Sequence, residues 1–359
     1  MAFRMNDILT DRITTSGIEI RPLAEAGVDW LRYLNDDPFA DICHHHAWGL
    51  IFAETFGYDS LLVAHRDQGR IDGGVPMILF DQPITGKAMI SMPYLNYGGV
   101  LGRTEEIKHE IVNSCRMILG KLGGSYLELR HAGWTLGSVA DRTIQNRVAF
   151  RLDINRPAKD IFNDLKKQLR TRLRKAADQG LESYRGQDRL DDFYYLFAQA
   201  MREHGTPVMP RRFFAGVLAK FGDQAQFMIA YKDARPVGGK LMLTFKNRAT
   251  MTWGCYPDRH KHLLANYYLT WELIQQLAGG PVQVIDFGRS APGSGGYIYK
   301  SNWQGREIPI HVDYIASAPD KIPHLKPDNV KFRLAIATWK RLPLPVTKIV
   351  GPRLARYFP

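Results

Sequence analysis

The chain has 359 residues, which is room for about two domains of roughly 150 residues each. Its apolar fraction of 45% allows large packed cores, and its charged fraction of 23% excludes a wholly disordered chain. The 48 Lys and Arg outnumber the 36 Asp and Glu, which gives a formal net charge of +12. This excess indicates an acidic partner such as nucleic acid, anionic lipid or a phosphorylated substrate, without choosing among them.

Cysteine spacing and hydropathy exclude several classes of protein. The three cysteines are far apart and form no CxxC pair, so neither a zinc finger nor a disulfide framework is indicated. We therefore expect a reduced, cytoplasmic compartment. The first residues lack the apolar core of a signal peptide, and no run reaches the ~18–20 apolar residues that span a bilayer. If the protein works at a membrane, we expect it to be peripheral on the inner membrane.

The first 150 residues alternate between strand-like and helix-like segments. Apolar residues at helical spacing predict helices over 38–56 and 105–122, and an aromatic, Gly-rich stretch predicts a loop over 91–102. Short apolar runs bounded by turn residues predict strands over 18–22, 60–64, 74–80 and 126–130.

A similar order recurs after about residue 150. Strands are predicted over 150–154, 227–231, 237–246, 249–254, 282–287 and 308–315. Helices are predicted over 161–179, 190–203, 211–221 and 261–277. The two series indicate an α+β chain of two tandem domains over 1–148 and 149–318, each a mainly antiparallel sheet flanked by helices.

The tail over 319–359 differs in composition from the rest of the chain. It holds nine Lys and Arg against two Asp, a net +7. Its apolar residues Phe332, Ala335, Ile336, Trp339 and Leu342 fall on one helical face, which predicts a basic amphipathic helix. Such a helix lies in an anionic membrane interface, or it packs on its own domain with the basic face in water. The sequence favours neither alternative.

Several catalytic and metal-binding patterns are missing. His44, His45 and His46 are consecutive, and consecutive residues on a helix point about 100° apart, so they converge poorly on one ion. We interpret them as local structure and predict no metal site. The sequence has no GxSxG, Walker A or GxGxxG motif, which argues against a serine hydrolase, an NTPase and a dinucleotide enzyme.

A strongly basic helix is predicted at DLKKQLRTRLRK, residues 164–175. Its leucines repeat every four residues, and six Lys and Arg surround them. The usual interpretation is a solvated helix face. The functional alternative is a phosphate-binding surface for RNA or a diphosphate-bearing substrate, with Lys167 and Arg170 as candidate contacts.

The segment VIDFGRSAPGSGGYIYKSNWQG, residues 284–305, is the most informative. A strand ends near Asp286, Arg289 follows at its carboxyl end, and three glycines over 293–296 predict a loop that can approach a ligand closely. Aromatic residues and Lys300 come next, and this set suits an anionic, ring-bearing substrate. The alternative is a surface loop with anchoring aromatics.

The order of an aromatic strand, DFG, a Gly-rich loop, an aromatic–Lys step and a Trp resembles the FemAB-like proteins, which are tandem GNAT-fold acyltransferases. The segments 91–102, 166–180 and 266–274 share the resemblance. REHGTPVMPRRFF, residues 202–214, and the closing residues 342–359 resemble the branch associated with exosortase and PEP-CTERM systems. The resemblance covers essentially the whole chain.

The resemblance implies an N-acyltransferase that moves an acyl group from acyl-CoA, or an aminoacyl group from aminoacyl-tRNA, to an amine. The acceptor would be an anionic precursor of peptidoglycan, another cell-envelope polymer or exopolysaccharide. Lys300 matches the family lysine, which would stabilise an oxyanion or a phosphate, and Arg289 matches the basic position that pairs with an anionic group. Tyr297, Trp303 and Tyr97 are further candidate substrate contacts.

The donor and the general base stay open. The stretch 259–265 keeps Arg259 of a coenzyme A pyrophosphate loop but lacks both of its glycines, and no long coiled-coil arm for tRNA fits between 180 and 225. Asp286 is a candidate base or a cap of its own loop. His204 is a candidate base by its ordinary pKa, or a helix-end residue.

Two other functions compete with catalysis. One is a tRNA- or nucleic-acid-binding module, indicated by the basic helix and tail. The other is a degenerate, non-catalytic GNAT-like scaffold, indicated by the missing glycines. We expect no tightly bound cofactor and no DNA partner.

Overall fold

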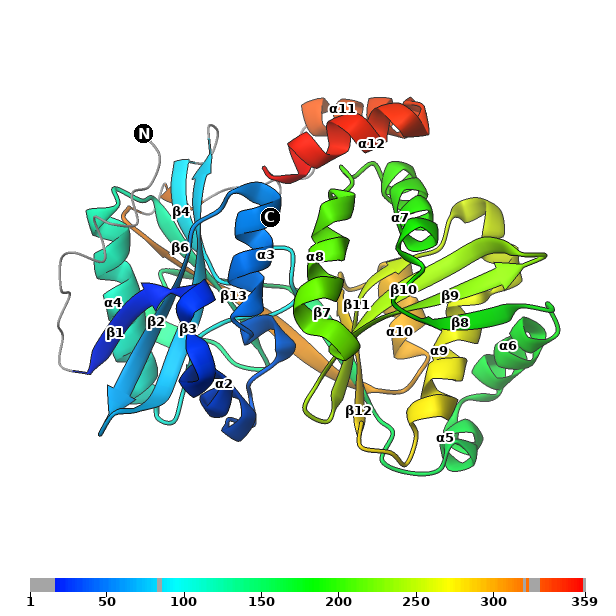
Figure 1. Cartoon of the computed structure of the whole chain (residues 1–359), viewed down its shortest axis with the longest axis horizontal. Helices are drawn as coiled ribbons and strands as arrows, with labels where there is room; N and C mark the ends of the chain where they lie inside the picture. Colours follow the sequence, from blue (N-terminus) through cyan, green and yellow to red (C-terminus); the bar gives the residue numbers. More distant parts are fainter. Residues whose placement is uncertain (1–16, 83–85, 319–320, 323–329, 358–359) are drawn as a thin grey trace. The chain divides into compact units, whose positions relative to one another are not determined.

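The computed structural model describes residues 17–82, 86–318, 321–322 and 330–357. Contacts group these residues into two compact units. The first contains the described residues up to Val148 together with those from Ile308 to Ile322. The second contains Ala149–Glu307 and the described residues after 325. Both units are α+β, as predicted (Figure 1).

The first unit is a sheet with helices packed against it. The strands in sheet order are β1 (Ile18–Pro22), β2 (Ser60–Asp67), β3 (Arg70–Gln82), β4 (Gly86–Ile90), β6 (Tyr126–Ala132) and β13 (Arg306–Ala316), and β5 (Leu101–Gly102) pairs with β3. The pairing is antiparallel except between β4 and β6. The helices are α2 (Gly27–Asp36), α3 (Ala47–Phe56) and α4 (Glu105–Lys121), and α4 covers the buried face of β2, β3 and β6.

The predicted helix over 38–56 is shorter in the structure. A 3-10 turn, Ile42–His44, precedes α3, and Asp41 caps that turn by accepting from the Cys43 N–H. The buried His44 ring accepts from the Asp41 N–H at 3.1 Å. The described residues contain no group of three or more His, Cys, Asp or Glu side chains arranged to hold a metal ion.

The second unit repeats the same plan with more helices. Its sheet order is β12 (Val284–Ser290), β11 (Arg248–Cys255), β10 (Arg235–Phe245), β9 (Ala225–Lys232) and β8 (Glu182–Gly186), and the end of β7 (Arg142–Asp153) lies beside β12. The helices are α5 (Ala158–Asp164), α6 (Lys167–Ala177), α7 (Leu190–His204), α8 (Arg211–Phe221), α9 (Ala265–Leu277), α10 (Gly295–Ser301), α11 (Val330–Arg341) and α12 (Leu344–Ala355).

Helices α7 and α9 cover opposite faces of this sheet. A Cβ at Gly239 of β10 would lie 3.5 Å from Leu196 of α7, whereas the next residue, Lys240, bonds to Thr270 of α9. Successive side chains of a strand point to opposite faces, so the two contacts place the helices on the two sides. Lys240 therefore points toward α9.

Three predicted elements differ from the structure. The helix predicted over 161–179 is two helices, because the Arg170 guanidinium donates to the carbonyls of Asn163 and Leu165 and closes α5 before α6 begins. The helix predicted over 261–277 starts as a 3-10 turn, Asp258–Leu263, and Leu264 at φ 55° separates this turn from α9. Of the three glycines predicted to form a loop, Gly293 lies in a turn, whereas Gly295 and Gly296 start α10, because the Ser294 hydroxyl accepts from the Tyr297 N–H at 3.1 Å.

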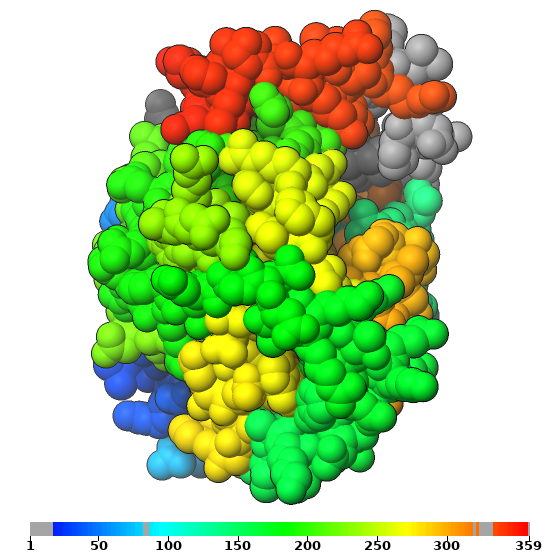
Figure 2. Space-filling model, turned by 90° about the vertical axis from the view of Figure 1, so that its right-hand side faces the viewer, coloured from blue at the N-terminus to red at the C-terminus, as the bar shows by residue number. Residues whose placement is uncertain are grey.

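The compact units divide the chain differently from the expected segments. Residues 308–316 group with the first unit because β13 pairs with β6, from Ile310 opposite Ala132 to Ala316 opposite Tyr126. The tail groups with the second unit because α11 and α12 pack on α7. Figure 2 shows these two helices as a layer in red. The side chain of Phe332 lies outside the described residues.

Candidate active site

Two parallel strands of the second unit separate part-way along their length. β11 and β12 pair only from Arg248 opposite Val284 to Thr250 opposite Asp286. Both strands continue, β11 to Cys255 and β12 to Ser290. Beyond Thr250 and Asp286 the two strands no longer pair with each other. A split of this kind leaves backbone N–H and C=O groups available to a ligand.

Asp286 explains why β12 turns away at this point. One carboxylate oxygen accepts from the Gly288 N–H at 2.8 Å, which is an Asx turn, and Gly288 has φ 68°. The other oxygen accepts from Arg151 Nε at 2.8 Å. The Asp286 side chain is completely buried. Both carboxylate oxygens are thus engaged in holding the backbone and Arg151, which favours the alternative of a loop cap over that of a general base.

Asp286→Ala is expected to lower the free energy of unfolding by about 3 kcal/mol, because the substitution removes the Asx turn and leaves the partly buried Arg151 without its carboxylate. Asp286→Asn keeps an acceptor for the Gly288 N–H and should lose less. Urea denaturation at neutral pH measures both. An Asp286→Ala variant as stable as the parent would contradict this role.

β11 is irregular where the strands part. Its register with β10 shifts between Leu241 opposite Trp253 and Met242 opposite Met251, so Thr252 has no residue opposite it. Such a bulge changes the direction of neighbouring side chains and is frequent beside active sites. Thr252 lines the pocket described next.

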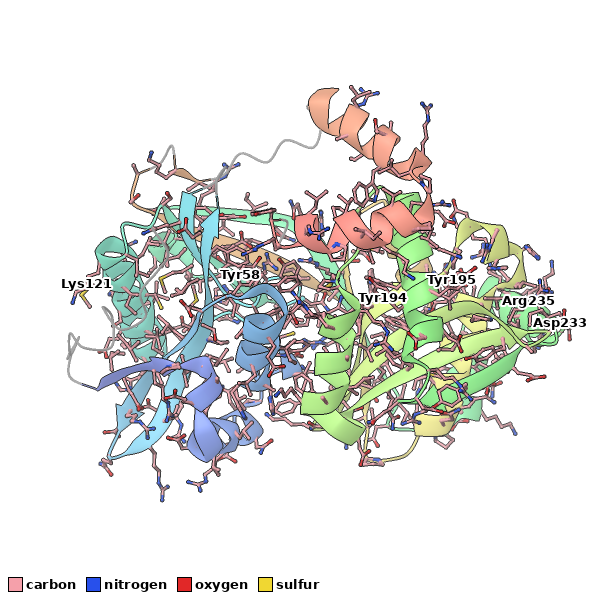
Figure 3. The ribbon with its side chains drawn as sticks, turned by 45° about the horizontal axis from the view of Figure 1, so that its top comes forward. Tyr58, Lys121, Tyr194, Tyr195, Asp233 and Arg235 are labelled. Carbon is pink, nitrogen blue, oxygen red and sulfur yellow. The ribbon has the colours of Figure 1, made fainter. Side chains whose placement is uncertain are left out.

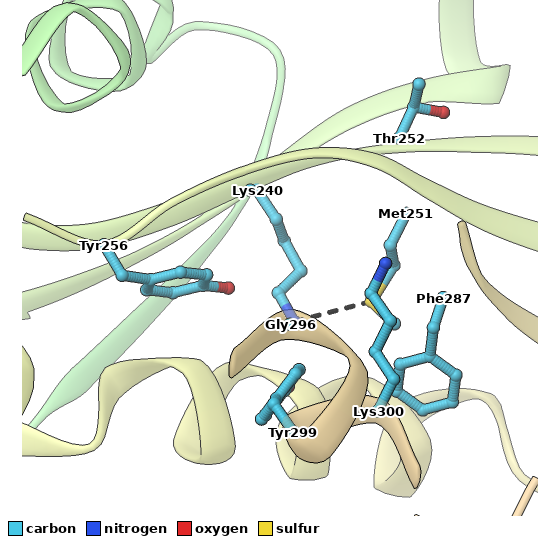
Figure 4. A pocket seen from close by; sticks show the side chains of 9 residues that line it. Lys240, Met251, Thr252, Tyr256, Phe287, Gly296, Tyr299 and Lys300 are labelled. Atoms are coloured by element: carbon cyan, nitrogen blue, oxygen red, sulfur yellow. Dashed lines mark hydrogen bonds between the residues drawn. The ribbon is translucent and has the colours of Figure 1, made fainter. Parts of the chain in front are cut away.

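A pocket of about 230 Å³ lies beside the split (Figure 4). β10 and β11 form one wall, and β12 and α10 form the other. The lining residues are Lys240, Met251, Thr252, Gly254, Tyr256, Phe287, Gly296, Tyr299 and Lys300. The pocket therefore combines apolar walls with two lysines, a common composition for a small-molecule site.

Lys240 is buried in the wall formed by β10, with 3% of its surface exposed. Its Nζ donates to the Thr270 hydroxyl and lies 3.4 Å from the Met251 sulfur, and neither contact is a carboxylate. Burial lowers the pKa of Lys240 to about 7, and the positive charge of Lys300 contributes to this shift. Near neutral pH a large fraction of Lys240 is therefore uncharged.

The contacts of Lys240 continue as a chain of hydroxyl groups. The Thr270 and Tyr299 hydroxyls are 2.6 Å apart, and the Tyr299 hydroxyl donates to the Asn266 carbonyl at 3.0 Å. The Tyr299 hydroxyl is thus fixed by a backbone carbonyl of α9, and it in turn holds the Thr270 hydroxyl. This arrangement holds the Lys240 amine at a defined place in the pocket.

Lys300 reaches the pocket from α10. Its Nζ donates to the carbonyls of Gly288 at 3.0 Å and Arg289 at 2.8 Å, in the part of β12 beyond the split. Burial lowers the pKa of Lys300 to about 8, partly offset by the Asp286 carboxylate, and the Arg289 charge lowers it further. The pocket thus holds two amines, of which Lys300 keeps its proton to higher pH.

The other residues of the 284–305 segment lie in different surroundings. Arg289 is exposed on β12, and its carbonyl helps to hold Lys300. The Tyr297 hydroxyl donates to Glu307 at 2.8 Å, outside the pocket lining. Trp303 is completely buried, with its ring stacked on Phe287 at 6.0 Å between centroids. We therefore correct the interpretation of Trp303 as a substrate contact and assign it to the core behind the pocket.

The remaining predicted residues are not among those lining the pocket. Tyr97 is buried in the first unit, and Lys167 is exposed on α6. Arg170 closes the end of α5, and His204 is exposed at the last residue of α7. Arg259 donates to the Tyr195 hydroxyl at 3.1 Å on the surface.

Lys240 is the candidate site residue that sequence reasoning missed. It lies inside VGGKLMLTF, residues 237–245, where most of the neighbouring residues are buried. A lysine within such an apolar strand is unusual, since buried lysines are rare without a reason. That interruption is the signal that could have identified it.

A comparison with known protein families matches the part of the chain that forms the pocket. Residues 163–301 match the family model described as an acetyltransferase (GNAT) domain. The chain has a tandem GNAT-like fold. The matched segment contains both pocket lysines. No curated protein sequence matches the chain at a significant level.

Solved structures share this fold at low sequence identity. FemX is 11% identical with a TM-score of 0.61, covering 82% of this chain and 96% of FemX. The C-terminal (DUF2156) domain of a putative lysylphosphatidylglycerol synthetase from Agrobacterium fabrum is 12% identical, with a TM-score of 0.56 and coverage of 83% and 93%. A tandem GNAT protein from the clavulanic acid pathway is 14% identical, with a TM-score of 0.53 and coverage of 84% and 99%. Identities this low show the fold alone.

Proposed function

We propose that the second unit catalyses N-acyl transfer to an amine on an anionic cell-envelope or exopolysaccharide precursor, with the Lys240–Lys300 pocket as its active site. The observation that carries the proposal is the placement of two lysines of lowered pKa at the split between parallel strands of a GNAT domain. We also propose that the chain belongs to the exosortase-associated branch, on the motif over 202–214.

The two lysines can take different roles in the reaction because their pKa values differ. Lys300 keeps its proton at neutral pH, so its ammonium stabilises the negative charge that develops on the carbonyl oxygen of the donor. Uncharged Lys240 accepts a proton from the acceptor ammonium and frees the nucleophilic amine.

The reaction balances without a metal or a covalent enzyme intermediate. The free amine attacks the acyl carbonyl and forms a tetrahedral intermediate with a new C–N bond. The intermediate then collapses and breaks the C–S bond of a thioester or the C–O bond of an ester. The departing sulfur or oxygen takes up a proton, and the attacking nitrogen loses one. Backbone groups at the split hold the acyl group during these steps, so positioning supplies much of the rate.

The proposal allows two acyl donors that have chemical groups in common. Acyl-CoA and aminoacyl-tRNA both contain an adenosine that carries phosphate and an activated acyl group, which is a thioester on the pantetheine arm in the first and an ester on the terminal ribose in the second. In the stretch 259–265 the backbone reaches φ 55° at Leu264, a conformation that a glycine would adopt without strain. The stretch contains no glycine, so it lacks the close backbone approach that a pyrophosphate loop needs, and we assign it no contact with the donor.

A binding experiment distinguishes the donors. Labelled bulk aminoacyl-tRNA is titrated with the purified full chain at low and high salt, with acetyl-CoA and free CoA as competitors. Binding of tRNA that CoA does not displace indicates aminoacyl transfer, and binding of CoA without tRNA indicates an acyl-CoA enzyme. Binding of neither donor would contradict the proposed function.

The pH dependence of transfer follows from the two lysines. We expect kcat/KM to rise as Lys240 loses its proton around pH 7 and to fall as Lys300 loses its proton around pH 8. Lys300→Arg keeps the positive charge above that pH and should remove the fall on the alkaline side. Rates measured across this range test the assignment. A flat profile in the parent would contradict it.

A nucleic-acid-binding function is the second candidate. The observation that favours it is the exposed row of Lys166, Lys167, Arg174 and Lys175, which starts at the N-cap of α6 and continues along that helix. RNA binding that weakens steeply with salt, with no acylated product, would support this alternative.

A further inference from the structure

Helices α11 and α12 are firmly packed on the second unit. Trp339 of α11 and Thr347, Gly351 and Ala355 of α12 are buried on the inner side. A Cβ at Gly351 would lie 2.9 Å from the Val208 backbone nitrogen, so these backbones approach closely. Lys348 Nζ lies 5.6 Å from the centre of the Tyr194 ring of α7, which Figure 3 labels. The two helices thus form a fixed layer.

The outer side of this layer is unusually apolar. Of the eleven exposed large hydrophobic side chains found among the described residues, five belong to these two helices and a sixth, Tyr357, follows α12. They are Leu334, Ile336, Val346, Ile349, Val350 and Tyr357. Leu334 and Ile349 are 68% and 63% exposed. A Cβ at Gly205 would lie 2.5 Å from Ile336 Cγ2, so Ile336 faces the second unit. We call the other five residues the tail face. Apolar side chains gathered on a soluble surface mark a contact with a partner.

The charged residues of the two helices themselves have one sign. Residues 329–359 contain seven Lys and Arg and no Asp or Glu. Arg333, Lys340, Arg341 and Arg353 are exposed beside the apolar residues. A partner that covers the tail face must therefore be apolar and negatively charged at once.

We propose that the tail face binds the surface of an anionic lipid bilayer. A bilayer supplies an apolar interior for Leu334 and Ile349 and anionic headgroups for the surrounding cations. Nucleic acid would use the cations but leave the aliphatic side chains in water. A second copy of the chain would bring like charges together. The inference does not rest on the proposed acyl transfer.

The test measures co-sedimentation of the full chain with vesicles. Vesicles of phosphatidylcholine mixed with phosphatidylglycerol are expected to bind the parent, and vesicles of phosphatidylcholine alone are expected to bind at least tenfold more weakly. Leu334→Glu combined with Ile349→Glu should weaken binding to the anionic vesicles at least tenfold. Lys340→Gln combined with Arg341→Gln should weaken it and reduce its dependence on salt.

Matched controls distinguish an effect of the tail face from an effect of negative charge added elsewhere on the surface. Val28 and Phe39 are 73% and 72% exposed in the first unit, so Val28→Glu combined with Phe39→Glu adds the same charge elsewhere and should bind as the parent does. Unchanged thermal unfolding shows that each variant folds. Failure of the parent to bind anionic vesicles would overturn the proposal. So would binding that the Leu334/Ile349 variant retains, or a parent dimer in solution that this variant converts to monomers.

Discussion

Lys300→Met is expected to lower kcat/KM for acyl transfer by about 10²–10³-fold near neutral pH. The substitution keeps a flexible apolar chain of similar length but removes the charge that faces the pocket. The carbonyls of Gly288 and Arg289 lose their donor, and the oxyanion loses its counter-charge. Gly288 is buried and Arg289 is exposed, so water can replace the donor at the Arg289 carbonyl, and we expect a small loss of stability.

Two control variants accompany Lys300→Met. One keeps a positive charge at the same position, and the other removes a lysine elsewhere. Lys300→Arg keeps the charge and should retain more activity than Lys300→Met. Lys261→Met removes an exposed lysine that pairs with Asp258 and should leave the rate unchanged. If Lys300→Met and Lys261→Met were equally active, Lys300 would have no part in the reaction.

Lys240→Met is expected to have opposite effects on activity and stability. Activity should fall about 10²–10⁴-fold, because the pocket loses the amine that takes the proton. Stability should rise, because the folded state no longer has to hold a buried ammonium. The folded pKa of about 7 lies below the ordinary lysine value of 10.5, so the unfolded chain binds the proton more tightly between these values.

The sign of the pH effect follows from this difference in proton binding. Stability of the parent rises with pH between about 7 and 10.5 and is lowest below this window, where both states hold the proton. The gain from Lys240→Met should therefore be on the order of 3 kcal/mol near pH 6 and should shrink as the pH approaches 10.

Urea denaturation of Lys240→Met and the parent across this range measures the gain. Lys261→Met again serves as the control, since that lysine is exposed in the folded protein. A Lys240→Met variant that is less stable than the parent at every pH would contradict this prediction. It would show that the contacts of Lys240 stabilise the fold by more than the burial of its charge destabilises it.

Much of the fold was predictable because local signals agree with the tertiary structure. The helix α8 has the predicted bounds, since Pro210 precedes it and Gly222 ends it. The strands β9, β10 and β11 follow their apolar runs closely. The split helix at 161–179 was not predictable from periodicity, because the leucine repeat continues across the break and a bond made by Arg170 decides it.

Only part of the candidate site could be predicted from the sequence. Lys300 and the Asp286–Gly288 turn follow from the DFG segment and the lysine that comes after it. Lys240 lies 60 residues earlier, and only the pairing of β10 with β11 and its contact with α9 bring it to the pocket. Trp303 was assigned wrongly because an aromatic residue near a predicted loop gives no sign of its burial.

The most direct test of the account is transfer of label to an amine acceptor. Labelled acetyl-CoA or labelled aminoacyl-tRNA is incubated with the full chain and an amine-bearing envelope precursor fraction, and acid-stable amide product is counted. We expect the parent and Lys261→Met to form the same amide with one donor, and the Lys240→Met/Lys300→Met double variant to form none above background. Product formed by the double variant at the parent rate, or no product from the parent with either donor, would contradict the account.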